Sequence, residues 1–146
     1  METYPFDICF TVPGLPVGKG RPRVTRFGAY TPEKTRAYEE KVRQCWESQS
    51  GARAPEGAAV MAEIIAWFPI PKATPKGRRD SLEGAYHLKR PDCDNIAKAV
   101  LDSLNGYAYK DDSAVQLRIE KRYTNGAPRV SVRLRGITFC QKSLEE

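Results

Sequence analysis

Asp92 and Asp94 are the residues of this 146-residue chain whose types and spacing most directly suggest chemistry. They follow Pro91 in a stretch predicted to be extended, and side chains two residues apart in an extended segment point to the same side. Two ionised carboxylates this close repel each other unless a cation or a shared proton relieves them. Mg²⁺ fits this role, because it prefers oxygen ligands and usually takes one or two carboxylates together with water and substrate phosphate.

The residues after Asp94 predict a helix that ends just before Gly106. Apolar residues recur there at helical spacing, and the short polar side chain of Asp94 or Asn95 can cap the first turn. Lys98 lies one turn after Asp94. Because helical side chains lean towards the N-terminus of their helix, its ammonium group could reach the place where the two carboxylates lie.

A second acidic pair, Asp111 and Asp112, opens the strand predicted after this helix. Two acids, a lysine one turn later and a further acid from the next strand would form a metal site able to support phosphodiester cleavage. Strand alternation allows only one acid of the second pair to face that site. The alternative is that these acids cap a helix and form a polar turn, which is commoner for each residue alone but explains their joint occurrence poorly.

Basic segments flank this acidic stretch in a chain with net charge +6 and a pI near 9.2. That distribution favours an anionic partner, although a basic protein with no nucleic-acid role is the alternative. Residues 17–30 predict a basic hairpin or loop, in which Phe27 and Tyr30 could stack on exposed bases or simply pack. Residues 72–89 predict a second basic loop, which could be a DNA-contacting flap ordered only on substrate, with a disordered, solvated loop as the alternative. The residues predicted to bind DNA are Lys19, Arg21, Arg23, Arg26, Lys76, Arg78, Arg79, Lys89 and Arg90.

Cysteine and histidine usage argues against two other kinds of site. The four cysteines are scattered without a Cys-x-x-Cys pair, and His87 is the only histidine, so a structural zinc site is not expected. A catalytic pair of Cys93 and His87 is a weak alternative, because nothing in the sequence orients His87. No apolar run is long enough to cross a membrane and the N-terminus lacks the form of a signal peptide, which predicts a cytoplasmic protein with reduced thiols.

The order of predicted elements indicates a single α+β domain over residues 1–146. We expect two layers, with a mixed β-sheet, two helices on one face of it and a basic N-terminal hairpin or loop. Residues 60–68 are apolar at nearly every position, which places that strand centrally in the sheet. Residues 115–122 and 130–135 alternate on either side of Asn125-Gly126 and predict an antiparallel hairpin.

The central stretch resembles the RusA family of Holliday junction resolvases. The resemblance lies in Pro91-Asp92-Cys93-Asp94-Asn95, Lys98, Leu101-Asp102-Ser103-Leu104 and Tyr109-Lys110-Asp111-Asp112-Ser113, and more weakly in Gly18-Lys19-Gly20-Arg21-Pro22-Arg23 and Tyr30-Thr31-Pro32. It implies a Mg²⁺-dependent endodeoxyribonuclease, with Mn²⁺ as a substitute, that resolves four-way DNA junctions by paired symmetric nicks. It also implies a homodimeric, bacterial or phage-encoded protein that acts in recombination, DNA repair or phage DNA processing.

The resemblance assigns roles to particular residues. Asp92, Asp94 and Asp112 would be the metal-binding acids, with Asp111 as the second choice for the last, and Lys98 would be the essential lysine. Lys98 would stabilise developing negative charge or position the attacking water. A two-fold homodimer would place one active site at each of two opposed strands of a junction with approximate two-fold symmetry.

Other functions remain open at this stage. The first is a metal-dependent nuclease that uses the same residues on flaps, single strands or other branched DNA. The second is a non-catalytic DNA-binding protein in which the acids are structural. An enzyme acting on small phosphorylated molecules is disfavoured, because the sequence has no glycine-rich phosphate loop followed by lysine and serine or threonine.

Overall fold

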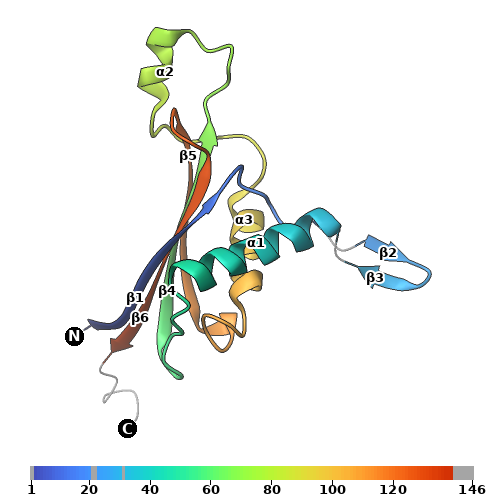
Figure 1. Cartoon of the computed structure of the whole chain (residues 1–146), viewed down its shortest axis with the longest axis vertical. Coiled ribbons are helices and arrows are strands. Elements are labelled where there is room, and N and C mark those ends of the chain that lie inside the picture. Colours follow the sequence, from blue (N-terminus) through green and yellow to red (C-terminus); the bar gives the residue numbers. More distant parts are fainter. Residues whose placement is uncertain (1, 21–22, 31, 140–146) are drawn as a thin grey trace.

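A computed structural model describes residues 2–20, 23–30 and 32–139 of the chain. A four-stranded mixed sheet in the order β1-β6-β4-β5 carries the helices α1 and α3 on one face (Figure 1). This arrangement confirms the predicted two-layer α+β fold. The elements are β1 (Glu2–Pro13), β2 (Arg23–Thr25), β3 (Gly28–Tyr30), α1 (Glu33–Gln49), β4 (Ala59–Pro69), α2 (Lys76–Leu82), α3 (Cys93–Leu104), a 3-10 turn (Asp112–Ala114), β5 (Val115–Thr124) and β6 (Arg129–Phe139). No helix among these is long and apolar enough to span a membrane.

Strand β4 is central, as its apolar sequence predicted. It pairs with β5 in parallel along one edge and with β6 antiparallel along the other. Every second residue from Val60 to Phe68 is buried against the helices, whereas the residues between them are partly exposed on the opposite face. The strand is therefore hydrogen-bonded along both edges and buried on one face, which agrees with its largely apolar sequence.

The predicted antiparallel hairpin of β5 and β6 is wrong, although both strands exist. The chain does turn near Asn125-Gly126, but β4 lies between the two strands. Burying β4 requires hydrogen-bonded partners along both of its edges, so the connection passes across the end of β4 instead of folding β6 back onto β5. A turn sequence such as Asn-Gly indicates that the chain reverses direction. It does not indicate whether the two strands that it connects are neighbours in the sheet.

Helices α1 and α3 pack on each other and on the sheet through apolar stripes at helical spacing. α1 buries Tyr38, Val42 and Trp46, and α3 buries Ile96, Val100 and Leu104 among others. Asn105 and Gly106 end α3 as predicted, with Gly106 at a φ of +80° that favours glycine. This packing sets the axis of α3 and hence the position of the acids at its two ends.

The predicted basic loop at residues 72–89 contains a helix, α2, at the end of the sheet (Figure 1). Hydrogen bonds join the segment to the end of β5 and to the residues that follow β4. Glu83 accepts bonds from the Thr124 hydroxyl at 2.9 Å and from the Asn125 N–H at 2.5 Å. Arg79 donates to the Pro71 carbonyl at 2.9 Å. The segment thus contains a helix and is hydrogen-bonded to the sheet, and its predicted ordering on DNA stays a prediction.

The basic N-terminal segment forms the predicted hairpin, with β2 paired to β3 in register from Arg23↔Tyr30 to Thr25↔Gly28. We call residues 23–30 the arm, because they extend away from the sheet and helices (Figure 1). Gly28 has a φ of +117°, a conformation that residues with a Cβ rarely adopt. The glycine thus permits the tight reversal at the end of the arm.

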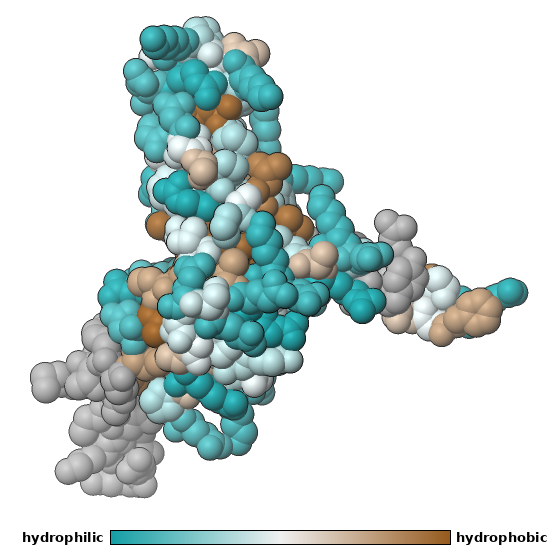
Figure 2. Space-filling model, in the orientation of Figure 1, coloured by the Kyte–Doolittle hydropathy of each residue, from teal (hydrophilic) through white to brown (hydrophobic). Residues whose placement is uncertain are grey.

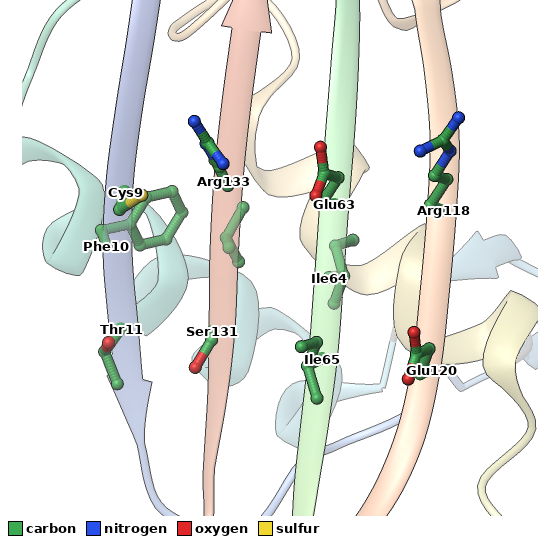
Figure 3. Close-up of a pocket in the computed structure, with 11 residues that line it drawn as sticks. Cys9, Phe10, Thr11, Glu63, Ile64, Ile65, Arg118, Glu120, Ser131 and Arg133 are labelled. Carbon is green, nitrogen blue, oxygen red and sulfur yellow. The ribbon is translucent and has the colours of Figure 1, made fainter.

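The sheet face opposite the helices carries side chains of both charges around a shallow depression of about 480 Å³ (Figure 3). Arg133, Glu63 and Arg118 lie next to one another on three neighbouring strands. Asp7 pairs with Arg133 at 2.7 Å, and Glu63 pairs with Arg135. Because these charges already neutralise one another, this face lacks the uniform positive potential that binds a DNA backbone.

The two faces of β4 should respond differently to truncation. Ile64→Ala removes a side chain that is 1% exposed in the core and should lower the free energy of unfolding by about 2–5 kcal/mol. Ile65→Ala alters the partly exposed face and should cost about 1 kcal/mol or less. Denaturant unfolding of both variants measures the difference. Equal costs would contradict the assignment of Ile65 to an open face.

Candidate active site

The turn into α3 presents Asp92 and Asp94 to solvent. Asp92 is the N-cap residue with an extended backbone, and its side chain makes no capping hydrogen bond. Asp94 lies in the first helical turn, where its carboxylate accepts a bond from the Asn95 N–H at 3.0 Å. The predicted strand-like spacing of these acids is wrong, because Cys93 is already helical. Both carboxylates instead lie at the N-terminal end of α3, where the helix dipole is positive.

A polar cavity of about 510 Å³ opens beside this turn. It is lined by Gly18, Lys19, Arg90, Pro91, Asp92 and Asn95. The Lys19 N–H donates to the Asn95 carbonyl at 2.9 Å, and a Cβ on Gly18 would lie 2.8 Å from the Cβ of Pro91. The start of the basic segment therefore forms one wall of the cavity, and this close approach requires glycine at position 18.

Lys121 holds the loop that enters α3 from the side of the sheet. It projects from β5 and donates to the carbonyls of Lys89 at 2.7 Å and Pro91 at 2.9 Å. Sequence reasoning missed this role. The available signal was that Lys121 occupies an otherwise apolar position in the alternating pattern of β5.

His87 lies in the same loop and is held by aromatic contacts, which corrects the prediction that nothing orients it. Its ring stacks on Phe68 at 3.8 Å between centroids and meets the edge of Tyr123 at 5.0 Å. Burial lowers the pKa of His87, and the charges of Lys121 and Lys89 lower it further. A neutral, packed imidazole is therefore the stable form in the folded protein.

Lys19 lies mostly inside the protein, with 17% of its side chain exposed. Its ammonium group bonds to Asp102 of α3 at 2.5 Å and to Glu39 of α1 at 3.3 Å. Burial lowers the pKa of Lys19, but the hydrogen bonds and charges of the two carboxylates outweigh it, so the pKa is raised overall. The ammonium thus joins the basic segment to both helices, and the predicted contact with DNA stays a prediction.

The acids of the second pair differ in their surroundings. Asp111 accepts hydrogen bonds from the Ser113 hydroxyl at 3.0 Å and from the Ser113 N–H, which lower its pKa. Burial raises the pKa of Asp112, and the neighbouring acids Asp111 and Asp102 raise it further. Of the two acids, Asp112 is therefore the one whose ionised form a nearby cation would stabilise more.

The structure separates the two acidic groups along α3. Asp92 and Asp94 lie at its start, whereas the Asp112 N–H donates at 3.0 Å to the side chain of Asn105, which follows its last residue. Twelve helical residues span about 18 Å. Within the described ranges, no three His, Cys, Asp or Glu side chains lie close enough together to hold a metal ion.

Lys98 lies between the two acidic groups on the exposed side of α3. Among the described residues, neither it nor Asp92 nor Asp94 takes part in an ion pair. A lysine and two carboxylates that are not neutralised by one another remain available to a metal ion or a phosphate. Their catalytic roles and that of Asp112 stay predictions.

Apart from Lys19, the predicted DNA-binding residues that the structure describes fall on three separate parts of the molecule. Lys76, Arg78 and Arg79 lie on α2, Lys89 and Arg90 in the loop before α3, and Arg23 and Arg26 on the arm. Arg21 lies outside the described residues. Arg90 is the one of these, besides Lys19, that lines the cavity beside Asp92.

Comparison with known protein families matches residues 13–135 to endodeoxyribonuclease RusA. The chain belongs to the RusA family. The family consists of Holliday junction resolvases, which makes this protein an endodeoxyribonuclease and confirms the resemblance found in the sequence. The chain is also similar to the uncharacterized protein YqaN of Bacillus subtilis strain 168, with 32% identity over 140 residues that cover 90% of this chain and 97% of that protein.

The matched region contains every element that shapes the cavity of this RusA-family chain, from Gly18 to Lys121. It also contains the acids at both ends of α3 and Lys98. Family membership shows an endodeoxyribonuclease but assigns no role to a particular residue, so the catalytic role of this cavity stays a prediction.

Removing the Lys19 ammonium should destabilise this fold. Lys19→Met leaves Glu39 and Asp102 close together without a cation, and we expect the free energy of unfolding to fall by about 1–3 kcal/mol. Lys98→Met is the matched control, because Lys98 is exposed and should change stability by less than about 0.5 kcal/mol. Thermal unfolding compares the two, and similar losses would contradict a structural role for Lys19.

His87 should make stability depend on pH. Its pKa is lowered in the folded state, so between that value and 6.5 the unfolded chain binds more protons, and stability falls as the pH falls through this range. Thermal unfolding between pH 7.5 and 5 should show this fall in the wild type and a smaller one in His87→Phe, which keeps the ring contact with Phe68. Identical slopes would show that His87 is not the titrating group.

Proposed function

We propose that the chain is a Mg²⁺-dependent, structure-selective endodeoxyribonuclease that resolves four-way DNA junctions by paired symmetric nicks. One observation carries the proposal: in a RusA-family chain, exposed Asp92 lines a cavity together with Arg90, and Asp94 is exposed two residues later in the first turn of α3. Cleavage of a phosphodiester needs acids to hold a metal ion at the scissile bond and cations to hold the backbone there. We place this activity in the cytoplasm, in recombination, DNA repair or phage DNA processing.

The residues fit a divalent ion such as Mg²⁺ or Mn²⁺. Asp92 and Asp94 offer carboxylate oxygens without a competing cation, and Asp112 has a pKa raised by burial and by the acids beside it. When bound, the ion orients the attacking water, lowers its pKa and stabilises charge on the phosphate and the leaving oxygen. Asp111 is the second choice because hydrogen bonds from Ser113 already occupy its carboxylate.

The chain supplies the remaining contributions through its own side chains. Arg90 at the cavity edge can bind a phosphate oxygen, and its planar guanidinium group suits that geometry. Lys98 stands one turn from Asp94 on the same side of α3 and offers positive charge where negative charge develops. The hydrogen bonds of Lys121 to the loop before Asp92 hold these groups in place.

We further propose that the active form is a homodimer. A two-fold dimer places one site at each of two opposed junction strands, so that both can be nicked in one complex. The separation of the acids along α3 adds a second reason. Because a single copy does not gather three carboxylates within the described residues, acids from the two ends of α3 can share one metal ion only if two copies contribute them.

Cleavage of a synthetic four-way junction tests the proposal. The wild type should make symmetric nicks in the presence of Mg²⁺, none in EDTA, and should spare linear duplex of the same sequence. Asp94→Asn should lower the cleavage rate by at least about 100-fold, because losing even the outer partners of a metal ligand costs about 10- to 100-fold. Denaturing gel electrophoresis of end-labelled strands measures each rate.

Glu47→Gln is the matched control, because Glu47 is an exposed acid on α1 far along the chain from the site. It should cut at the wild-type rate. Junction binding without cleavage under any divalent ion would reject the catalytic assignment and favour a structural role for the acids. Equal cleavage of flaps, single strands and junctions would instead favour a nuclease of broader substrate range.

A further inference from the structure

The arm at residues 23–30 ends in an apolar ring that faces solvent. Phe27 is 87% exposed and Val24 is 82% exposed, although neither belongs to the core or to the cavity at Asp92. The arm extends from the body of the protein, with apolar side chains near its end (Figure 2). An exposed aromatic ring on a projecting hairpin is available for contact with another molecule.

Hydrogen bonds define the turn that carries Phe27. The Phe27 N–H donates to the Thr25 hydroxyl at 3.1 Å, and that hydroxyl donates to the Gly28 carbonyl at 3.2 Å. With Gly28 at a positive φ, these bonds define the reversal and leave Phe27 at the end of the hairpin. The exposure of the ring therefore follows from the local turn and not from a missing contact within the core.

The charge of the arm indicates which partner the ring meets. Residues 23–30 include two arginines and no acid, and the guanidinium group of Arg26 lies 5.0 Å from the centroid of the Phe27 ring. Arginine beside an aromatic ring is the combination that binds unpaired nucleotides, with the cation at the phosphate and the ring on the base. The arm itself is basic, so its charge favours a polyanion such as DNA over a protein surface without excess negative charge.

We propose that Phe27 stacks on a base exposed at the branch point of the DNA junction, while Arg26 contacts the adjacent phosphate. The inference rests on the proposed function. In a continuous duplex the faces of the bases are covered by their neighbours, whereas strands that change partners at a branch leave base faces open. Phe27 would thereby distinguish branched DNA from linear DNA without reading its sequence.

Binding to a junction that carries 2-aminopurine at the branch point tests this role, with EDTA present to prevent cleavage. The wild type should change the 2-aminopurine emission and bind the junction more tightly than linear duplex. Phe27→Ala should lose most of the emission change and bind the junction about 5- to 150-fold more weakly, with duplex affinity changed less than about twofold. Phe27→Trp should restore both properties. Leu15→Ala is the control for loss of an exposed apolar side chain elsewhere.

Three results would overturn the inference. Phe27→Ala could match the wild type in emission change and junction affinity, or it could weaken duplex and junction binding equally. It could also convert a dimer into a monomer in sedimentation, which would make the arm a contact between copies. A wild type that does not prefer junction over duplex would instead reject the proposed function, and with it this inference.

Discussion

The contact between residues 18–19 and α3 is the constraint on which the candidate site depends. Lys19 bonds through its backbone N–H to Asn95 at the start of α3 and through its ammonium group to Asp102 two turns later. One residue therefore fixes both the distance and the direction of the basic segment along the helix. The cavity beside Asp92 exists because this segment cannot move away from the turn, and Gly18 lets the two backbones approach closely enough.

Electrostatics divides α3 into two unlike ends. At its start Asp92 and Asp94 are exposed at the positive end of the helix dipole, and no described cation forms an ion pair with them. Near its other end Lys19 neutralises Asp102, while Asp112 remains close to two other acids and has a raised pKa. The acids near either end of α3 would attract a cation, and Lys98 lies on the helix between the two ends.

Most of the fold could be predicted from sequence, because hydrophobic periodicity specifies single elements well. The central strand, both long helices and the basic hairpin agree with their patterns. The pairing of β5 with β6 was wrong because sheet order depends on contacts between residues distant in sequence. Helix α2 was missed because it buries no residue and so leaves no apolar stripe to recognise.

The candidate site was predictable in its residue types and only partly in its geometry. The acids, Lys98 and Arg90 could be named from spacing and charge, whereas Lys121 and His87 act through contacts that join β5, the loop before α3 and β4. Asp92 and Asp94 were predicted to lie in one extended segment. This is wrong because helix α3 already begins at Cys93, between the two acids. That single residue changes the physical argument, because it places both acids at the positive end of the α3 dipole instead of on one side of a strand. Asp112 lies near the opposite end of α3, which is why its proposed role as a third ligand depends on two copies of the chain.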